Sequence, residues 1–174
     1  GVTLAWMTHR AKMRWSNVFD VLIIVPFFIS PIVLAMAWLA VVGPSGFVNV
    51  LLRNILGENI FQISVESLLG IVTIMAFYLV PYIYIYTSIG LKNVDPAYEE
   101  ASYTSGAGTL RTALRITLPL ATPSIVAGML LAFVIAVSHF SIPLVLGRPH
   151  GIYVLTTIIY EMVNYFPPDF SQAA

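Results

Sequence analysis

Apolar residues run along this chain in three long blocks, at about residues 19–42, 65–89 and 123–146. A helix that crosses the roughly 30 Å hydrocarbon core of a bilayer needs about 20 mostly apolar residues. Each block is long enough for one crossing, and hardly any charge interrupts it. The pattern therefore predicts an all-α, polytopic α-helical membrane protein with three full spans.

Two shorter apolar segments lie outside these blocks. Residues 1–8 precede a basic cluster at residues 9–14, and we expect them to be the last turns of an earlier span that is cut off. A secretory signal peptide would carry its basic residues before the apolar run instead. The run 152–160 is too short to span, so we expect a surface or re-entrant helix there. Residues 1–174 are thus expected to be one membrane domain, a fragment with truncated spans at both ends.

Composition supports a membrane protein and argues against several other classes. Hydrophobic residues make up 59% of the chain and charged residues 9%, whereas a soluble domain has about 45–50% and about 25%. The net charge is zero, which leaves no basic surface to attract nucleic acid. Because the chain has no cysteine, we expect neither disulfides nor thiol catalysis nor cysteine-bound metal.

The basic residues predict the orientation of the spans. Six of the eight lysines and arginines fall in residues 9–18 and 90–118. Basic residues in short loops are retained on the cytoplasmic side. We therefore expect these two segments in the cytoplasm and the segments 43–64 and 147–170 outside.

Prolines and an amphipathic stretch add detail to the first two spans. Pro26, Pro31 and Pro81 are expected to bend their helices, although proline is also simply common in membrane helices. In the outer loop, residues 43–46 predict a turn. Residues 47–55 then alternate apolar and polar positions at helical spacing, which predicts a short helix on the membrane surface.

The loop after the second span is built differently from a plain connection. Asp95 is a good N-cap, and Pro96 fits the first helical position. Gly106 can adopt the left-handed conformation that closes a helix. The sequence therefore predicts a capped helix over residues 96–105, followed by a second helix that starts near Thr109 and ends at Pro119.

The length and side chains of this loop indicate a docking site. A simple connection needs about 2 to 6 residues, and this loop uses residues 92–118. Small residues such as Ala101, Ser102 and Ser105 would let a partner approach closely. The alternative interpretation is a solvated connecting loop without a partner.

The same loop carries a long motif: Glu100-Ala101-Ser102, three residues, Gly106, nine residues, then Ile116, any residue, Leu118 and Pro119. It resembles the EAA motif of the permeases of binding-protein-dependent ABC importers, type I, with the same spacing throughout. The one departure is Ser102, which stands where the family pattern has a second alanine.

The resemblance covers nearly the whole chain and implies a fold and a role. The fold would be the core of a type I ABC-importer permease, in part, in a bacterial or archaeal cytoplasmic (inner) membrane. It implies partners: ABC ATPase subunits, a periplasmic or lipoprotein solute-binding protein, a second permease unit (a tandem half, or a homo- or heterodimer) and membrane lipid, but no nucleic acid. The residues that it assigns to ATPase coupling are Glu99, Glu100, Ala101, Ser102, Gly106, Arg111, Arg115, Ile116, Leu118 and Pro119.

Within that family, three segments resemble permeases of ferric-iron, polyamine and related importers. These are residues 30–38, 43–46 and 140–147, with Leu155-Thr156-Thr157 following. Some such permeases contain two units in tandem, and the Gly-Pro-x-Gly loop at 43–46 is similar to the first unit. The resemblance implies ferric iron or a polyamine as the solute.

Signals of catalysis are missing from the sequence. It has no Walker phosphate-binding loop, and no paired-carboxylate or Ser-His-Asp pattern. His9, His139 and His150 are too scattered for a metal site. We therefore expect no cofactor and no enzyme activity in this chain. Two alternatives remain: a helical channel or scaffold without an ATPase partner, and an intramembrane enzyme, for which His139 would be the one candidate.

Pathway residues are expected in the second and third spans. We expect His139 to be the one titratable side chain inside a span, and ionisable groups there usually face a cavity or a partner. A neutral imidazole bonded to a backbone carbonyl is the alternative. The residues expected along the solute route are Tyr78, Tyr82, Ser138, His139 and Ser141. We assign Tyr84 and Tyr86 to an aromatic belt at the membrane surface instead.

Overall fold

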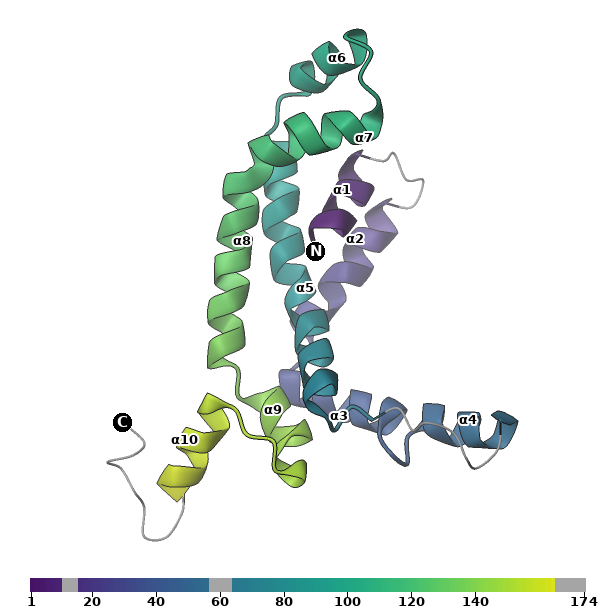
Figure 1. Cartoon of the computed structure of the whole chain (residues 1–174), viewed down its shortest axis with the longest axis vertical. Helices are drawn as coiled ribbons and strands as arrows, with labels where there is room; N and C mark the ends of the chain where they lie inside the picture. Colours follow the sequence, from purple (N-terminus) through teal and green to yellow (C-terminus); the bar gives the residue numbers. More distant parts are fainter. Residues whose placement is uncertain (11–15, 57–63, 165–174) are drawn as a thin grey trace. The chain divides into compact units, whose positions relative to one another are not determined.

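The computed structural model describes residues 1–10, 16–56 and 64–164, and no strand occurs among them (Figure 1). In chain order the helices are α1 (Val2–Arg10), α2 (Ser16–Ile24), the 3₁₀ turn η1 (Val25–Phe28), α3 (Pro31–Val42), α4 (Phe47–Leu56), α5 (Leu68–Lys92), α6 (Pro96–Thr104), α7 (Thr109–Thr112), the π-helical turn η2 (Ala113–Thr117), α8 (Leu118–Ser138), α9 (Ser141–Leu146), the 3₁₀ turn η3 (Arg148–His150) and α10 (Leu155–Asn164). The predicted all-α class is confirmed.

Three stretches of the described chain are long and apolar enough to cross a membrane. They are Pro31–Ile55, Leu68–Lys92 and Thr109–Ser138. The first includes the turn between α3 and α4, and α2 with η1 forms a shorter apolar helix, Val18–Phe28. A polytopic α-helical membrane protein is therefore confirmed, while the bounds of the apolar helices differ from those expected.

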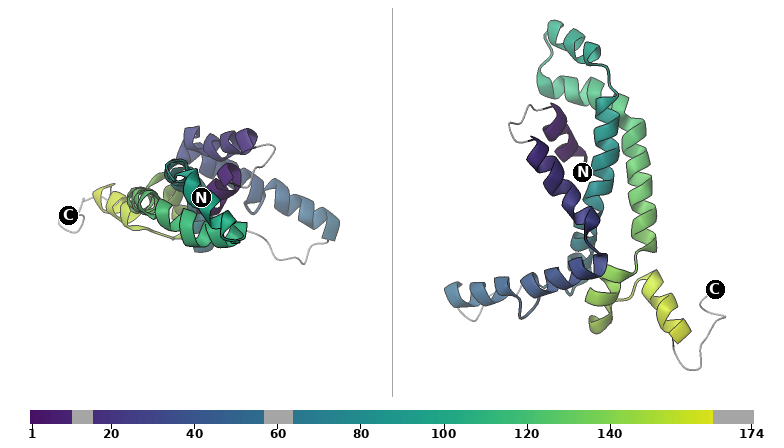
Figure 2. Two further views of the ribbon diagram at one scale, coloured as in Figure 1. Left: turned by 90° about the horizontal axis from the view of Figure 1, so that it is seen from above. Right: turned by 180° about the vertical axis from the view of Figure 1, so that it is seen from behind.

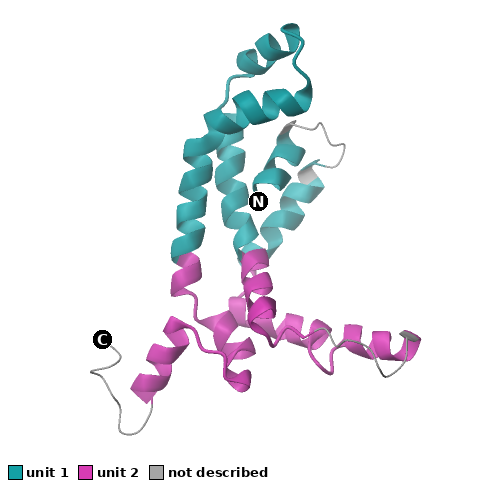
Figure 3. Cartoon of the chain, in the orientation of Figure 1, with its two compact units in different colours: residues 1–28, 79–134 teal, residues 29–78, 135–174 magenta. Residues whose placement is uncertain are grey.

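The chain forms two compact units (Figure 3). Unit 1 contains Gly1–Phe28 and Leu79–Val134, and unit 2 contains Ile29–Tyr78 and Ile135–Ala174. The expected docking loop lies wholly in unit 1, and His139 lies in unit 2.

Unit 1 is held together by apolar packing and by close approach of α5 and α8. The ribbon shows α1 and α2 beside α5 (Figures 1 and 2), along the part of α5 that belongs to unit 1 (Figure 3). A Cβ atom added at Gly90 would lie 2.7 Å from Cβ of Ser124, and one at Gly128 would lie 2.8 Å from Cβ of Tyr86. Small residues at such crossings let membrane helices pack closely. The buried residues of this core are Ala5, Tyr84, Leu91, Val94, Ala121 and Ile125.

Unit 2 is built around α3, which packs against α9 and α4. The turn between α3 and α4 forms as predicted: Gly46 donates its N–H to the carbonyl of Gly43 at 2.8 Å. The side chain of Asn49 donates to the same carbonyl at 2.8 Å. The amphipathic helix predicted over 47–55 is α4, where Phe47, Leu51 and Ile55 are exposed.

The first apolar block is not one helix. α2 ends at Ile24, a 3₁₀ turn follows, and a new helix begins at Pro31. Pro26 lies in the 3₁₀ turn, and Pro31 occupies the first position of α3. Each proline lacks an N–H for the α-helical ladder, so the bends expected from these two residues become a break. By contrast, α5 continues through Pro81.

The prediction that the second loop helix ends at Pro119 is wrong. α7, η2 and α8 run without interruption from Thr109 to Ser138. Leu118 donates its N–H to the carbonyl of Ala113, five residues back. The next residue, Pro119, has no N–H to donate. The hydrogen bonds thus shift from four-residue to five-residue spacing just before the proline that lacks a donor. The helix therefore continues through Pro119.

The third apolar block is also divided, because α8 ends at Ser138 and α9 begins at Ser141. A single helix over 123–146 was therefore the wrong expectation. The polar residues Ser138 and His139 stand at the point where the helix stops. The short helix expected near 152–160 is α10, with the bounds Leu155–Asn164.

Candidate functional site

α6 is capped at both ends, as the sequence predicted. The carboxylate of Asp95 accepts the N–H of Ala97 at 2.9 Å, and Pro96 opens the helix. At the other end Gly106 has a φ of 80°, and Ala107 donates its N–H to the carbonyl of Ser102 at 3.1 Å. This closure is a common way to end a helix with a left-handed glycine.

Two hydrogen bonds fix α6 to the helical run that follows it. The hydroxyls of Ser102 and Thr112 lie 2.8 Å apart, and Thr117 donates to the carboxylate of Glu99 at 2.8 Å. Thr112 and Thr117 are both 1% exposed. One side of α6 is therefore held against α7 and η2 by one buried and one partly buried hydrogen bond.

This bracing corrects one expectation about Ser102. The sequence suggested that its small side chain faces a partner, but Ser102 is buried against Thr112 of its own chain. The serine hydroxyl, at the position where the family pattern has a second alanine, supplies an internal bond. Glu99 likewise accepts a hydrogen bond from within unit 1.

The other side of α6 is open. Glu100, Ala101, Ser105 and Gly106 are exposed. Apart from Gly106 and its two chain neighbours, no residue has an atom within 4 Å of a Cβ added at Gly106. Two tyrosines that we had not selected from the sequence share the exposed surface of this helix: Tyr98 is 57% exposed and Tyr103 45%. Tyrosines are frequent anchors of protein interfaces. Their presence on a short helix with predicted caps was the sequence signal that could have marked Tyr98 and Tyr103 as candidate contact residues.

The remaining residues assigned to ATPase coupling, which include two arginines outside the motif, are spread along the second helical run. Arg111 and Arg115 are exposed, and so is Pro119. Leu118 packs against the core of unit 1, and Ile116 is half-buried. The motif therefore combines an exposed part on α6 with a structural part on η2 and α8.

His139 lies just beyond the end of α8 and contacts Tyr78. The two ring centroids are 5.0 Å apart, and the hydroxyl of Thr156 donates to the backbone carbonyl of His139 at 2.9 Å. The Nε2 atom of His139 is buried and has no hydrogen-bond partner within the described residues. A buried polar atom without a hydrogen-bond partner lowers the free energy of unfolding. His139 is therefore a candidate for a role other than packing in unit 2.

The other expected pathway residues have contacts of their own within each unit. Ser138 donates to the carbonyl of Ile135 in its own helix, and Ser141 is half-buried at the start of α9. Tyr82 packs against Phe27 in unit 1, with ring centroids 5.2 Å apart. The structure thus pairs Tyr78 with His139 and Tyr82 with Phe27.

A polar cluster in unit 1 was missed from the sequence. Tyr84 of α5 donates a hydrogen bond to the carboxylate of Asp20 in α2, and it shares a second one, 2.9 Å long, with Thr8 of α1. Tyr84 is only 2% exposed, so its assignment to an aromatic belt was wrong. Asp20 lies in the short apolar helix Val18–Phe28, whereas His139 lies just beyond the apolar run Thr109–Ser138. The expectation that His139 is the one titratable side chain inside a span is therefore wrong.

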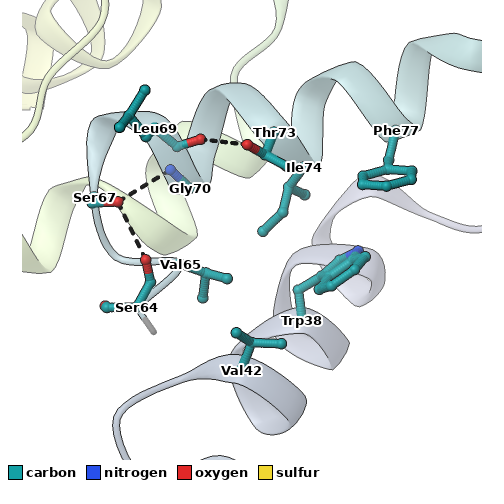
Figure 4. Close-up of a pocket in the computed structure, with 10 residues that line it drawn as sticks. All are labelled: Trp38, Val42, Ser64, Val65, Ser67, Leu69, Gly70, Thr73, Ile74 and Phe77. Atoms are coloured by element: carbon teal, nitrogen blue, oxygen red, sulfur yellow. Dashed lines mark hydrogen bonds between the residues drawn. The ribbon is translucent and has the colours of Figure 1, made fainter. Parts of the chain in front are cut away.

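A pocket of about 510 Å³ lies in unit 2 beside α3 and the start of α5 (Figure 4). Its hydroxyls are already bonded within the protein, since Thr73 donates to Leu69 and Ser67 to Ser64. The pocket is therefore apolar in character and offers little to a charged solute. Its lining residues are Trp38, Val42, Ser64, Val65, Ser67, Leu69, Gly70, Thr73, Ile74 and Phe77.

The described residues contain no group of three or more histidines and carboxylates that could hold a metal ion. The features that remain are an outward-facing, braced helix in unit 1 and an unpaired imidazole nitrogen in unit 2. Neither arrangement contains an acid, base and nucleophile in mutual contact.

One family profile matches nearly the whole chain. Residues 1–168 match the profile of the family described as binding-protein-dependent transport system inner membrane component. The chain belongs to this family, which confirms its resemblance to the permeases of type I, binding-protein-dependent ABC importers.

Several relatives carry names of transport permeases. A probable molybdenum ABC transporter permease of Haloferax volcanii is 30% identical over 84% of this chain and 51% of its own length. A putative ferric transport system permease of Haemophilus influenzae is 29% identical over 100% of this chain and 27% of its own length. A molybdenum transport system permease of Escherichia coli is 27% identical over 94% of this chain and 71% of its own length. The chain thus spans about half of the first relative and about a quarter of the second.

Proposed function

We propose that this chain is part of the permease subunit of an ABC importer, in which α6 couples solute transport to a separate ATPase. One observation carries the proposal: α6 is capped at both ends, braced from behind and exposed on its other side. Family membership supports it, because relatives are named as ABC and transport-system permeases. The ATPase would supply the hydrolysis, and this chain would be no enzyme.

The bracing explains how such a helix would transmit force. A partner that grips the exposed face of α6 pulls on Glu99 and Ser102 as well, since both lie on the same short helix. Their bonds to Thr117 and Thr112 pass the displacement to α7 and η2. Two packed elements that shift as a unit are the usual basis of a gating motion.

The remaining partners follow from the same proposal. Residues 90–118 would lie in the cytoplasm, where the ATPase subunits are, as the basic residues predict. A solute-binding protein would deliver solute from outside, and a second permease unit would complete the pathway. Tyr78, Ser138, His139 and Ser141 are the pathway candidates in unit 2, and Tyr82 is the candidate in unit 1.

Ferric iron is the solute that we propose first. Support comes from a relative named for ferric transport, which matches this chain over all of its residues. The resemblance of the loop at residues 43–46 adds to it. Relatives named for molybdenum and sulfate transport are about as similar, so the experiment must separate these solutes. Mass spectrometry of the ligand carried by the cognate binding protein does so directly.

The docking proposal is tested with matched glycine variants. Gly106→Ala forces an alanine into the left-handed region, at a cost of roughly 1 kcal/mol, and places a methyl group where the partner approaches. Gly108→Ala is the control, because Gly108 has a φ of −77° and open space around it. Glu100→Arg reverses the charge on the exposed face.

We expect Gly106→Ala and Glu100→Arg to lower ATPase co-purification and solute uptake, with membrane insertion unchanged. Gly108→Ala should behave as wild type in both assays. Normal ATPase binding and uptake in Gly106→Ala and in Glu100→Arg would show that α6 is not the docking site.

A further inference from the structure

Two arginines stand one turn apart on the run formed by α7 and η2. Arg111 and Arg115 are both exposed, and neither forms an ion pair or hydrogen bond with a residue that the structure describes. Leu110 and Leu114 lie next to them and are 68% and 58% exposed. A helix that presents exposed leucines beside exposed arginines has the character of a membrane-surface helix.

The two leucines join an apolar groove to a basic hollow. The groove has a volume of about 310 Å³ and is lined by residues of α1 and of the run from α7 to α8. A neighbouring hollow of about 570 Å³ is lined by both arginines and by the same two leucines. Both features lie in unit 1. The groove is lined by Val2, Thr3, Trp6, Met7, Leu110, Ala113, Leu114 and Leu118.

We propose that this surface binds an anionic phospholipid of the cytoplasmic leaflet. One acyl chain would lie in the groove between α1 and α7, and the phosphate would bind Arg111 and Arg115. The proposal rests on the cytoplasmic position of residues 90–118 given under the proposed function.

Three observations favour a lipid over other occupants. The hydrogen-bonding side chains along the groove are Thr3 and Trp6, and the other six lining residues are apolar, which suits a hydrocarbon chain. Guanidinium groups match the geometry of phosphate oxygens and bind them in pairs of hydrogen bonds. Trp6 lines the groove, and tryptophan is enriched at the level of lipid headgroups. One molecule with an apolar tail and an anionic head satisfies all three.

The proposal assigns the arginines a different role from the one that the motif suggested. As ATPase contacts they would leave Leu110 and Leu114 facing water, whereas a lipid covers the leucines and neutralises the arginines together. Docking of the ATPase would then depend on α6 alone.

The test uses the full-length permease complex in nanodiscs that contain phosphatidylglycerol or phosphatidylcholine. A photoreactive amino acid replaces Leu114, and native mass spectrometry identifies what it captures and which lipid stays bound. We expect phosphatidylglycerol to be captured and retained. Arg111→Gln and Arg115→Gln should each weaken its retention about fivefold, because an arginine near an anionic surface contributes about that factor.

Arg53→Gln is the matched control, since Arg53 is an exposed arginine on α4 in unit 2. It should leave phosphatidylglycerol retention unchanged. Capture of the ATPase or of a second permease unit at position 114 would overturn the proposal. Equal retention of the two lipids would also overturn it, and so would phosphatidylglycerol retention that neither Arg111→Gln nor Arg115→Gln changes. This experiment measures the mass of bound lipid, whereas the α6 variants are tested by ATPase co-purification and solute uptake. The lipid proposal can therefore fail while the docking proposal holds, and the docking proposal can fail while the lipid proposal holds.

Discussion

Thr117 and Glu99 are joined by a hydrogen bond of 2.8 Å, although they are 18 residues apart in the chain. Thr117 is 1% exposed and belongs to the π-helical turn η2, whereas Glu99 lies in the first turn of α6. A side chain inside the helical run thus holds the helix that we propose as the docking element.

Removal of this bond should loosen α6 without unfolding the protein. Thr117→Val keeps the volume of the side chain but loses the hydroxyl, and a bond to a carboxylate contributes about 1.5–3 kcal/mol. We expect weaker ATPase co-purification and faster hydrogen exchange at the amides of residues 96–106. Thr122→Val is the control, because Thr122 bonds only to Leu118 in its own helix. Equal exchange in the two variants would contradict the bracing role.

The cluster of Asp20, Tyr84 and Thr8 should contribute to stability. Tyr84→Phe keeps the buried ring but removes the hydroxyl that bonds the other two residues, and a buried acceptor left unpaired costs about 1–3 kcal/mol. We expect a lower melting temperature in detergent. Tyr86→Phe should change it little, since Tyr86 is 36% exposed. A Tyr84→Phe protein as stable as wild type would mean that the cluster adds nothing.

His139 should affect transport rather than assembly if it lies along the solute pathway. His139→Leu removes both ring nitrogens, including the buried Nε2 that has no partner among the described residues. We expect altered uptake kinetics with normal ATPase co-purification, and partial recovery in His139→Gln, which retains a donor. Unchanged kinetics in His139→Leu would assign the residue to packing, and so would a loss of expression.

The topology can be tested with single cysteines, because these 174 residues contain none. Ser45→Cys lies in the exposed turn before α4, and Gly108→Cys lies in the loop before α7. We expect a membrane-impermeant maleimide to label Ser45→Cys in intact cells and Gly108→Cys only after permeabilisation. Labelling of both positions from outside would reverse the predicted side of the loop.

Local signals in the sequence were enough to predict much of the docking element. Asp95 and Pro96 begin α6 and Gly106 ends it through contacts with residues nearby in the sequence. Their roles can therefore be predicted from the local order of residues. The same holds for the apolar helices, whose length follows from bilayer thickness, and for the turn at Gly43. The predictions of several helix ends were wrong. At Pro119, for example, the helix continues because its hydrogen bonds shift to five-residue spacing.

Contacts between distant segments could not be predicted from these signals. The inward position of Ser102 depends on Thr112, and the burial of Tyr84 depends on Asp20, 64 residues away. A serine in place of the motif's alanine looked like a neutral exchange of small residues. Only packing in space shows that it forms a hydrogen bond and that α6 has a closed face and an open face.

The uninterrupted run from Thr109 to Ser138 has a consequence for the free energy of docking. A flexible joint between loop and span would have to become ordered each time a partner bound, and ordering costs about 1–2 kcal/mol for each residue. The run from α7 through η2 into α8 is helical at every residue. Binding energy gained at the proposed docking loop would therefore not be spent on conformational entropy at the entrance to the span.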